Sequence, residues 1–230
     1  MDSLEDRKRR VRTLIDRLES AYPDARCLLD FSTPLDLLVA TILAAQCTDE
    51  RVNKTTPEVF KRFQSPEDYA NAHLNTLYSL FRPCGTYRQK ARSVKKACQA
   101  IAEQHGGEVP RDIEQLSALP GVGRKTANVV LGNAFGVPSI IVDTHVLRLA
   151  GRLGLASPHN VKQKYADKIE QELLPIVPER QRTRFSHLLT FHGRFCCTAR
   201  KPRCPECPIE DLCPYDQKTT EEQLKKGKRK

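Results

Sequence analysis

The segment that most constrains the fold of this 230-residue chain runs from residue 119 to residue 125 and reads LPGVGRK. Apolar residues at helical intervals lie on both sides of it, which predicts a tight turn between two helices. Pro120 fixes its own φ, and Gly121 and Gly123 can adopt left-handed angles that a side chain would penalise. Because the glycines have no Cβ and the next helix begins with free N–H groups, the turn suits an anion such as a DNA phosphate. The alternative is an ordinary glycine-capped corner between two helices.

Helical periodicity dominates the rest of the chain. Apolar residues recur at helical spacing in the runs 4–18, 34–43, 74–80, 91–103, 161–174 and 180–192. The single strand-like run, residues 137–142, is too short and too isolated to build a sheet. We therefore predict an all-α fold.

The charge, the apolar runs and the cysteine content of the chain indicate which partners and which cellular compartment to expect for the protein. The formal net charge is +10, which favours a polyanionic partner such as nucleic acid. There is no run of about 18 apolar residues and no signal-peptide core, so we expect a soluble, cytoplasmic protein with no membrane partner. Nine cysteines are many for a reducing compartment, and an odd number argues against a disulfide framework. Five of them lie within residues 196–213, which indicates a metal centre.

Lys125 lies in the first turn of the helix that follows the glycines. Its amine could contact a phosphate or act as a nucleophile, and a nucleophilic amine has to lose its proton near neutral pH. The positive end of the helix, the neighbouring Arg124 and partial burial would each make that loss easier.

Asp143 follows a short apolar run and begins another helix. An aspartate in this setting is most commonly an N-cap, yet a carboxylate fixed there can also accept a proton from an amine and stabilise a developing cation. The two roles are compatible. The pair of Lys125 and Asp143 therefore favours catalysis over phosphate binding alone.

Four cysteines show the spacing C-x6-C-x2-C-x5-C, namely Cys197, Cys204, Cys207 and Cys213. Four thiolates this close in sequence can surround one centre, either tetrahedral zinc or an iron–sulfur cluster. Zinc usually binds two separated C-x2-C pairs and only one is present, which favours the cluster. Cys196 is an alternative first ligand.

Together these motifs resemble the endonuclease III family, bifunctional DNA glycosylases of the helix-hairpin-helix superfamily. The resemblance rests on the LPGVGRK segment, on VDTH at residues 142–145 and on the cysteine spacing, and it extends from about residue 6 to about residue 215. It implies two helical domains that flank a cleft for damaged double-stranded DNA, and a [4Fe–4S] cluster as the cofactor. It also implies removal of oxidised pyrimidines followed by β-elimination at the abasic site through a lysine Schiff base.

The resemblance also assigns domains and roles. It implies an N-terminal helix over residues 1–26 that packs with the second domain, a six-helix domain over 27–137 and an iron–sulfur domain over 138–215. Residues 216–230 are polar and lysine-rich, and we expect a disordered basic tail. By the same match Lys125 is the nucleophile and Asp143 the catalytic carboxylate. The chain is expected to act as a monomer.

Several further residues are expected to contact DNA. Gln46 matches the family's residue that fills the gap left by a flipped nucleotide, and Thr86 stands where bacterial members carry a bulkier apolar wedge. The remaining expected contacts come from the turn and from the basic loop between the cysteines, namely Gly121, Gly123, Arg124, Arg200, Lys201 and Arg203. A non-catalytic DNA-binding module and a glycosylase that uses water as its nucleophile are the alternatives.

Overall fold

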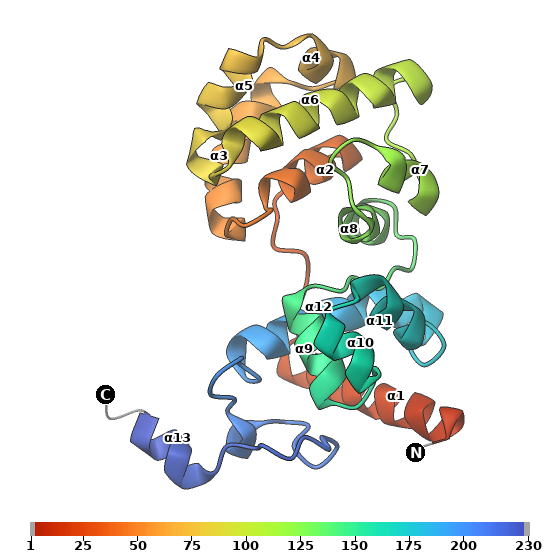
Figure 1. The fold of residues 1–230 in the computed structure, drawn as a ribbon, viewed down its shortest axis with the longest axis vertical. Coiled ribbons are helices and arrows are strands. Elements are labelled where there is room, and N and C mark those ends of the chain that lie inside the picture. Colours follow the sequence, from red (N-terminus) through yellow and green to blue (C-terminus); the bar gives the residue numbers. More distant parts are fainter. Residues whose placement is uncertain (1–2, 228–230) are drawn as a thin grey trace. The chain divides into compact units, whose positions relative to one another are not determined.

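The computed structural model describes residues 3–227, and every regular element within that range is helical, which confirms the all-α prediction (Figure 1). The chain forms two compact units. Unit 1 combines residues 1–26 with residues 138–230, and unit 2 is the continuous stretch 27–137. No helix within the described range has both the length and the apolar character needed to cross a membrane.

Unit 2 is built around a central apolar helix, α2. Thr33 caps its N-terminus in a reciprocal capping box with Asp36, and Pro34 occupies the first turn. Seven of its ten residues are buried, because α3, α6 and α8 all pack against it. The unit has seven α-helices where the resemblance implied six, and one short 3-10 turn: α2 (Pro34–Leu43), α3 (Asp49–Arg62), α4 (Pro66–Asn71), α5 (Leu74–Phe81), η1 (Arg82–Cys84), α6 (Tyr87–Gln104), α7 (Ile113–Ala118) and α8 (Arg124–Ala134).

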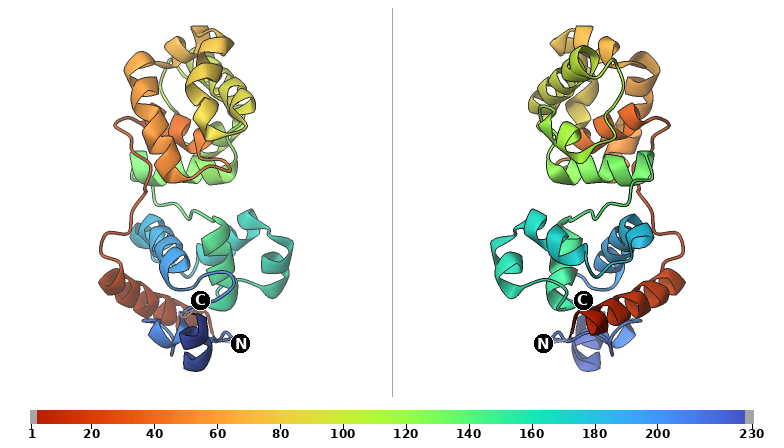
Figure 2. Two further views of the ribbon diagram at one scale, coloured as in Figure 1. Left: turned by 90° about the vertical axis from the view of Figure 1, so that its left-hand side faces the viewer. Right: turned by 90° about the vertical axis from the view of Figure 1, so that its right-hand side faces the viewer.

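Unit 1 joins the two ends of the chain around one core. The apolar stripe of α1 is fully buried at Val11, Leu14, Ile15 and Leu18, and α1 packs against α12, which also packs on α9 (Figure 2). Its elements are α1 (Leu4–Ala21), α9 (Thr144–Arg152), α10 (Pro158–Gln163), α11 (Ala166–Leu173), η2 (Glu179–Gln181), α12 (Arg182–Phe195), η3 (Cys204–Glu206) and α13 (Glu221–Gly227).

The periodic run 161–174 does not form the single helix that its spacing suggests. Lys164 adopts a left-handed conformation with φ of 58°, and it separates α10 from α11. The break lets α10 pack closely on α9, where an added Cβ at Gly151 would lie 2.8 Å from Val161 Cγ1. Close helix packing therefore outweighs local periodicity here.

The tail also differs from the prediction of disorder. Helix α13 begins after Thr220, whose hydroxyl accepts from the N–H of Gln223 at 3.4 Å while the Gln223 side chain accepts from the Thr220 N–H at 3.0 Å. This is a capping box, and its sequence signature is the Thr-x-x-Gln spacing that the tail contains. Lys218 is held by an ion pair with Glu210 at 2.6 Å. The last residues of the predicted tail, 228–230, and residues 1–2 of the predicted N-terminal segment lie outside the described range.

Candidate functional site

Helices α7 and α8 and the turn between them form the predicted helical hairpin. Asp112 caps α7, with its carboxylate accepting from the N–H groups of Glu114 and Gln115 at 3.0 and 2.9 Å. Gly121 has the left-handed φ of 80° that the sequence predicts. Gly123 does not, because it is the N-cap of α8 with an extended backbone at φ of −91°. Only one of the two glycines is therefore needed for its backbone angles.

Gly121 is also needed for packing. A Cβ built on it would lie 2.5 Å from the Cβ of Ser93, so the turn packs directly against α6. A Cβ on Gly123 would meet nothing within 4 Å. The open space beside Gly123 at the N-terminus of α8 leaves room for a phosphate at this point.

We expect the two glycines to respond differently to substitution by alanine. Gly121→Ala combines left-handed strain with overpacking against Ser93, and should lower the free energy of unfolding by about 2–4 kcal/mol. Gly123→Ala should change it by less than about 1 kcal/mol and should instead weaken duplex DNA binding, because a methyl group enters the phosphate position. Urea denaturation and fluorescence anisotropy with a labelled duplex measure the two effects. Equal stability of the two variants would contradict the assignment.

A groove in unit 2 brings together three of the predicted DNA contacts. Gln46, Thr86 and Gly121 all line it, and its volume is about 250 Å³. Gln46 lies just beyond the end of α2, Thr86 just before α6 and Gly121 in the hairpin turn, so three separate connections meet at one surface. Gln46 and Thr86 are both exposed.

Arg124 and Lys125 are the first two residues of α8, immediately after the hairpin turn that lines this groove. Lys125 is exposed. Arg124 lies 4.0 Å from a Glu114 carboxylate oxygen across the hairpin. The hairpin therefore presents one exposed lysine and one guanidinium partly engaged with its own acid.

Asp143 is the N-cap of α9 in unit 1, as its sequence setting predicts. One carboxylate oxygen accepts from the N–H groups of His145 and Val146 at 2.8 and 2.7 Å. The other oxygen lies 3.3 Å from the hydroxyl of Thr190 on α12. Capping thus uses one oxygen, and the second oxygen of the half-buried carboxylate accepts from Thr190.

The segment that carries Asp143 is extended and buried but does not pair with a strand. Alternate residues of the segment meet hydroxyl side chains that recur along one face of α12. The N–H of Ser139 donates to Thr183 and the N–H of Ile141 donates to Ser186, before Thr190 meets Asp143. These hydroxyls satisfy buried backbone groups that a sheet would otherwise satisfy. The predictions from the sequence did not include these three hydroxyls, although their spacing at i, i+3 and i+7 on one helix is a recognisable signal.

Two histidines lie close to Asp143. Burial lowers the pKa of His145 below its usual value, and burial, with a smaller contribution from Arg184, lowers the pKa of His187 to about 4. Both rings are therefore neutral near pH 7. The Nδ1 of His145 lies 3.1 Å from the guanidinium of Arg148, which also donates to the carbonyl of Cys197 at 3.0 Å. Arg148 thus ties the start of α9 to the cysteine loop.

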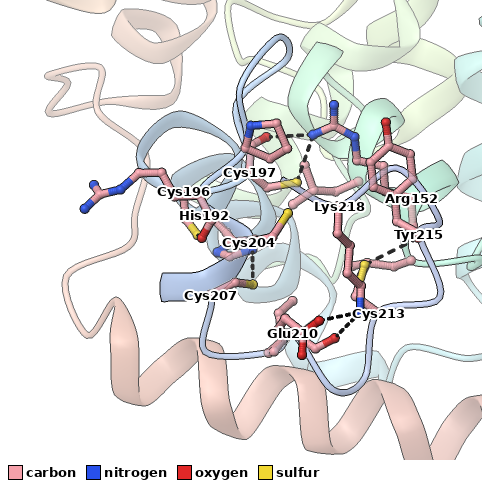
Figure 3. Close-up of a pocket in the computed structure, with 15 residues that line it drawn as sticks. Arg152, His192, Cys196, Cys197, Cys204, Cys207, Glu210, Cys213, Tyr215 and Lys218 are labelled. Atoms are coloured by element: carbon pink, nitrogen blue, oxygen red, sulfur yellow. Dashed lines mark hydrogen bonds and ion pairs between the residues drawn. The ribbon is translucent and has the colours of Figure 1, made fainter. Parts of the chain in front are cut away.

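The four predicted ligand cysteines line a single cavity in unit 1, shown in Figure 3. Its wall is largely apolar and includes Leu149, Leu153 and Ile209. Thiolates in an apolar enclosure are the donor set that an iron–sulfur cluster requires. The residues present therefore fit such a cluster.

Arg152 organises one side of this cavity. Its guanidinium donates to the Sγ of Cys197 at 3.1 Å and to the carbonyls of Thr198 and Ala199 at 2.8 and 2.9 Å. It also lies over the ring of Tyr215, 4.8 Å from the centroid (Figure 3). Nothing in the sequence distinguishes this arginine from the other basic residues.

A second set of donors overlaps the first. The ligand atoms of His192, Cys196 and Cys207 all lie within 4.8 Å of one another. The thiol of Cys196 donates to Cys207, which raises the pKa of Cys196 and lowers that of Cys207 to about 5. The proton shared by this pair therefore lies on Cys196.

The loop between the first two ligands exposes Arg200, Lys201 and Arg203. All three line a larger groove of about 1030 Å³ together with Tyr215. Arg203 forms an ion pair with Glu206, so its charge is partly compensated within the loop. Arg200 and Lys201 are the cations of this loop that most readily face a phosphate.

Comparison with known proteins gives two family matches. Residues 39–178 match the HhH-GPD superfamily of base excision DNA repair proteins. Residues 197–213 match the iron–sulfur binding domain of endonuclease III, a range bounded by Cys197 and Cys213 that excludes both His192 and Cys196. This match confirms the iron–sulfur cluster as the cofactor.

Individual relatives match over nearly the whole chain. Endonuclease III of Synechocystis sp. is 45% identical over 212 residues, which cover 92% of this chain and 94% of that protein. Endonuclease III of Bacillus subtilis is 42% identical and covers 95% and 98%. A non-covalent endonuclease III–DNA complex and a trapped endonuclease III–DNA covalent intermediate both align over all of both chains, with 40% identity and a TM-score of 0.84. The chain therefore belongs to the HhH-GPD superfamily of base excision DNA repair proteins and, within it, to the endonuclease III family.

Proposed function

We propose that this protein is a bifunctional DNA glycosylase and abasic-site lyase that removes oxidised pyrimidines from duplex DNA. The observation that carries the proposal is the full-length similarity, at 40% identity, to an endonuclease III trapped in a covalent intermediate with DNA. A covalent link requires a nucleophile from the protein. A module that only binds DNA, or a glycosylase that uses water, has no need of one.

In this proposal unit 2 holds the DNA backbone and unstacks the target. The N–H groups at the start of α8 bind a phosphate beside Gly123, where no side chain obstructs it. Gln46 and Thr86, exposed on one groove, fill the space that an extruded nucleotide leaves. Extrusion costs a few kcal/mol and is easiest at a damaged pair, which contributes to selectivity.

Lys125 and Asp143 are the residues to which we assign the chemistry. The amine of Lys125 attacks C1′ as the base leaves with its bonding electrons, and the amine proton passes to a carboxylate. Asp143 is suited to that role because only one of its oxygens is committed to capping α9. The C1′–O4′ bond then breaks as the nitrogen lone pair forms the imine, and O4′ takes up a proton to become a hydroxyl. The protonated imine acidifies C2′, and loss of the C2′ proton expels the 3′ phosphate and breaks the strand.

The cofactor is a [4Fe–4S] cluster, and we propose Cys197, Cys204, Cys207 and Cys213 as its ligands. When bound, the cluster cross-links the loop through iron–thiolate bonds. Arg152 and Arg148 hold the same loop from α9 through the carbonyls of residues 197–199. The loop then presents Arg200 and Lys201 to the DNA backbone as a fixed pair of cations.

We further propose that the protein acts as a monomer on damaged duplex DNA at the nucleoid. Residues 1–26 serve as a helix of the iron–sulfur domain, and residues 27–137 form the hairpin-bearing domain. Arg124 and Arg203 contribute secondary phosphate contacts, since each is partly engaged with an acid.

A borohydride trapping experiment tests this function. The wild-type protein is incubated with a duplex that contains one 5,6-dihydroxylated thymine, with and without borohydride, beside the same duplex with normal thymine. We expect a covalent protein–DNA adduct and a β-elimination break with the lesion duplex alone, because borohydride reduces an imine to a stable amine. Base release without an adduct would favour water as the nucleophile, and binding without release would favour a module that only binds DNA.

A further inference from the structure

Two residues at the unit 2 groove have strained backbones. Within the described residues, the non-glycine residues with positive φ are Gln46 at 54°, Thr86 at 38° and Lys164 at 58°. The first two line the same groove, whereas Lys164 is in unit 1. Left-handed angles are especially unfavourable for a β-branched residue such as Thr86. Such conformations persist only where neighbouring structure holds them.

The neighbouring structure that holds them converges on Lys90. The side chain of Lys90 is buried, with the residue only 4% exposed. Its amine donates to the carbonyl of Leu43 at 2.8 Å and to the carbonyl of Cys84 at 2.5 Å. Leu43 ends α2, three residues before Gln46, and Cys84 ends η1, two residues before Thr86. One ammonium group therefore joins the two connections that carry the strained residues.

The hydrogen bonds and the burial of Lys90 argue against a direct contact with DNA, which is the usual role of a basic residue in a DNA-binding protein. Lys90 lines the same groove as Gln46 and Thr86, but it is only 4% exposed and its amine is turned to backbone carbonyls. Its amine donates to two backbone carbonyls, one of them at the negative end of a helix, rather than to a carboxylate. Burial lowers the pKa of Lys90, and the thiols of Cys47 and Cys84 beside it oppose that shift. The carbonyl contacts therefore compensate a real cost of desolvation.

We propose that Lys90 is a positioning residue for base extrusion, which fixes the spacing and the left-handed conformations of Gln46 and Thr86 so that both enter the vacated space together. The inference rests on the proposed function, in which these two residues fill that space. Without the ammonium, each connection can relax to an ordinary backbone conformation. The two side chains then no longer present a common surface to the DNA.

The test compares Lys90→Met with Lys95→Met. Lys95 is a matched control, because it lies on the same helix and its amine also donates to two carbonyls, those of Ala70 and Ala72, which belong to the end of α4. Two single-turnover rates are measured under reducing conditions. One is excision of an oxidised pyrimidine from a fully paired duplex, and the other is strand cleavage at a preformed abasic site, which has no base to extrude.

We expect Lys90→Met to lower the excision rate by at least about tenfold and the abasic-site rate by less than about threefold, as displaced positioning groups do. Lys95→Met should leave the ratio of the two rates at its wild-type value. In a Gln46→Ala background, Lys90→Met should cause a much smaller further loss, because both changes then act on one interaction. Should Lys90→Met fail to fold, Lys90→Gln, which retains a donor, is measured in the same way.

The possible results separate the inference from the proposed function. A wild-type protein that neither excises nor cleaves contradicts the function itself. An active wild type whose rate ratio is unchanged by Lys90→Met, or changed equally by Lys95→Met, overturns the role of Lys90. The role of Lys90 would also be overturned if the effects of Lys90→Met and Gln46→Ala on the excision rate were fully additive.

Discussion

Replacement of Lys125 by glutamine is expected to abolish the borohydride-stable adduct and to lower strand cleavage by a factor on the order of 10⁴ or more, as loss of an enzymic nucleophile does. Glutamine is polar and of similar reach, but its amide nitrogen is not nucleophilic. Lys125 is exposed, so the substitution leaves the packing of unit 2 intact. Affinity for a lesion duplex should persist, with the salt dependence reduced by about one counterion.

Arg124→Gln is the matched control for this experiment. Arg124 is the neighbouring cation at the start of α8, and its substitution removes one positive charge while the Lys125 amine remains. We expect Arg124→Gln to trap DNA as the wild type does, with a similar change in salt dependence. If Lys125→Gln still formed the adduct, or if both variants lost it, Lys125 would be a phosphate contact and the nucleophile would lie elsewhere.

The second large effect concerns the cysteine loop. The wild-type protein is expected to be yellow-brown and to contain about four irons per chain. Cys204→Ser removes one of four thiolates, so most of the iron and the colour should be lost. Metal analysis and visible absorbance of the purified proteins measure this directly. A colourless wild type with stoichiometric zinc would contradict the cofactor.

Cys196→Ser is the control for that prediction. Cys196 is buried and lines the same cavity, yet it donates its proton to Cys207 and lies outside the matched iron–sulfur range. We expect Cys196→Ser to retain the iron, since a serine hydroxyl can still donate. Loss of iron from Cys196→Ser but not from a Cys197→Ser variant would assign the first ligand to Cys196.

The hairpin could be predicted from the sequence because its determinants are local. Proline, glycine and the flanking periodicity are contained within a few turns of helix, and the left-handed φ of Gly121 follows from residue type. The same reasoning was wrong for Gly123, which is free of strain and is the N-cap of α8. Residue type shows that a left-handed angle is permitted, whereas only the neighbouring packing shows that it is used.

Features that depend on distant residues could not be predicted in the same way. Lys90 has the sequence context of an ordinary exposed helical lysine, and its burial depends on two carbonyls that lie 47 and 6 residues away along the chain. The hydroxyls of Thr183 and Ser186 have a pattern on α12, but their acceptor role is visible only once the segment before Asp143 lies against them. The chemistry of the site was therefore predictable, and the groups that hold it in place were not.

The division of unit 1 into two stretches of sequence has a consequence for biosynthesis. Helix α1 leaves the ribosome before unit 2, but its buried stripe packs on α12, which is made only after the whole of unit 2. At usual rates of translation, unit 2 alone takes roughly 5–20 s to synthesise. During that time the apolar face of α1 is exposed on the nascent chain, while unit 2, being continuous, can fold as it emerges. Trigger-type chaperones that bind apolar nascent segments should therefore engage this protein at its first helix and release it only when the last third of the chain has been made.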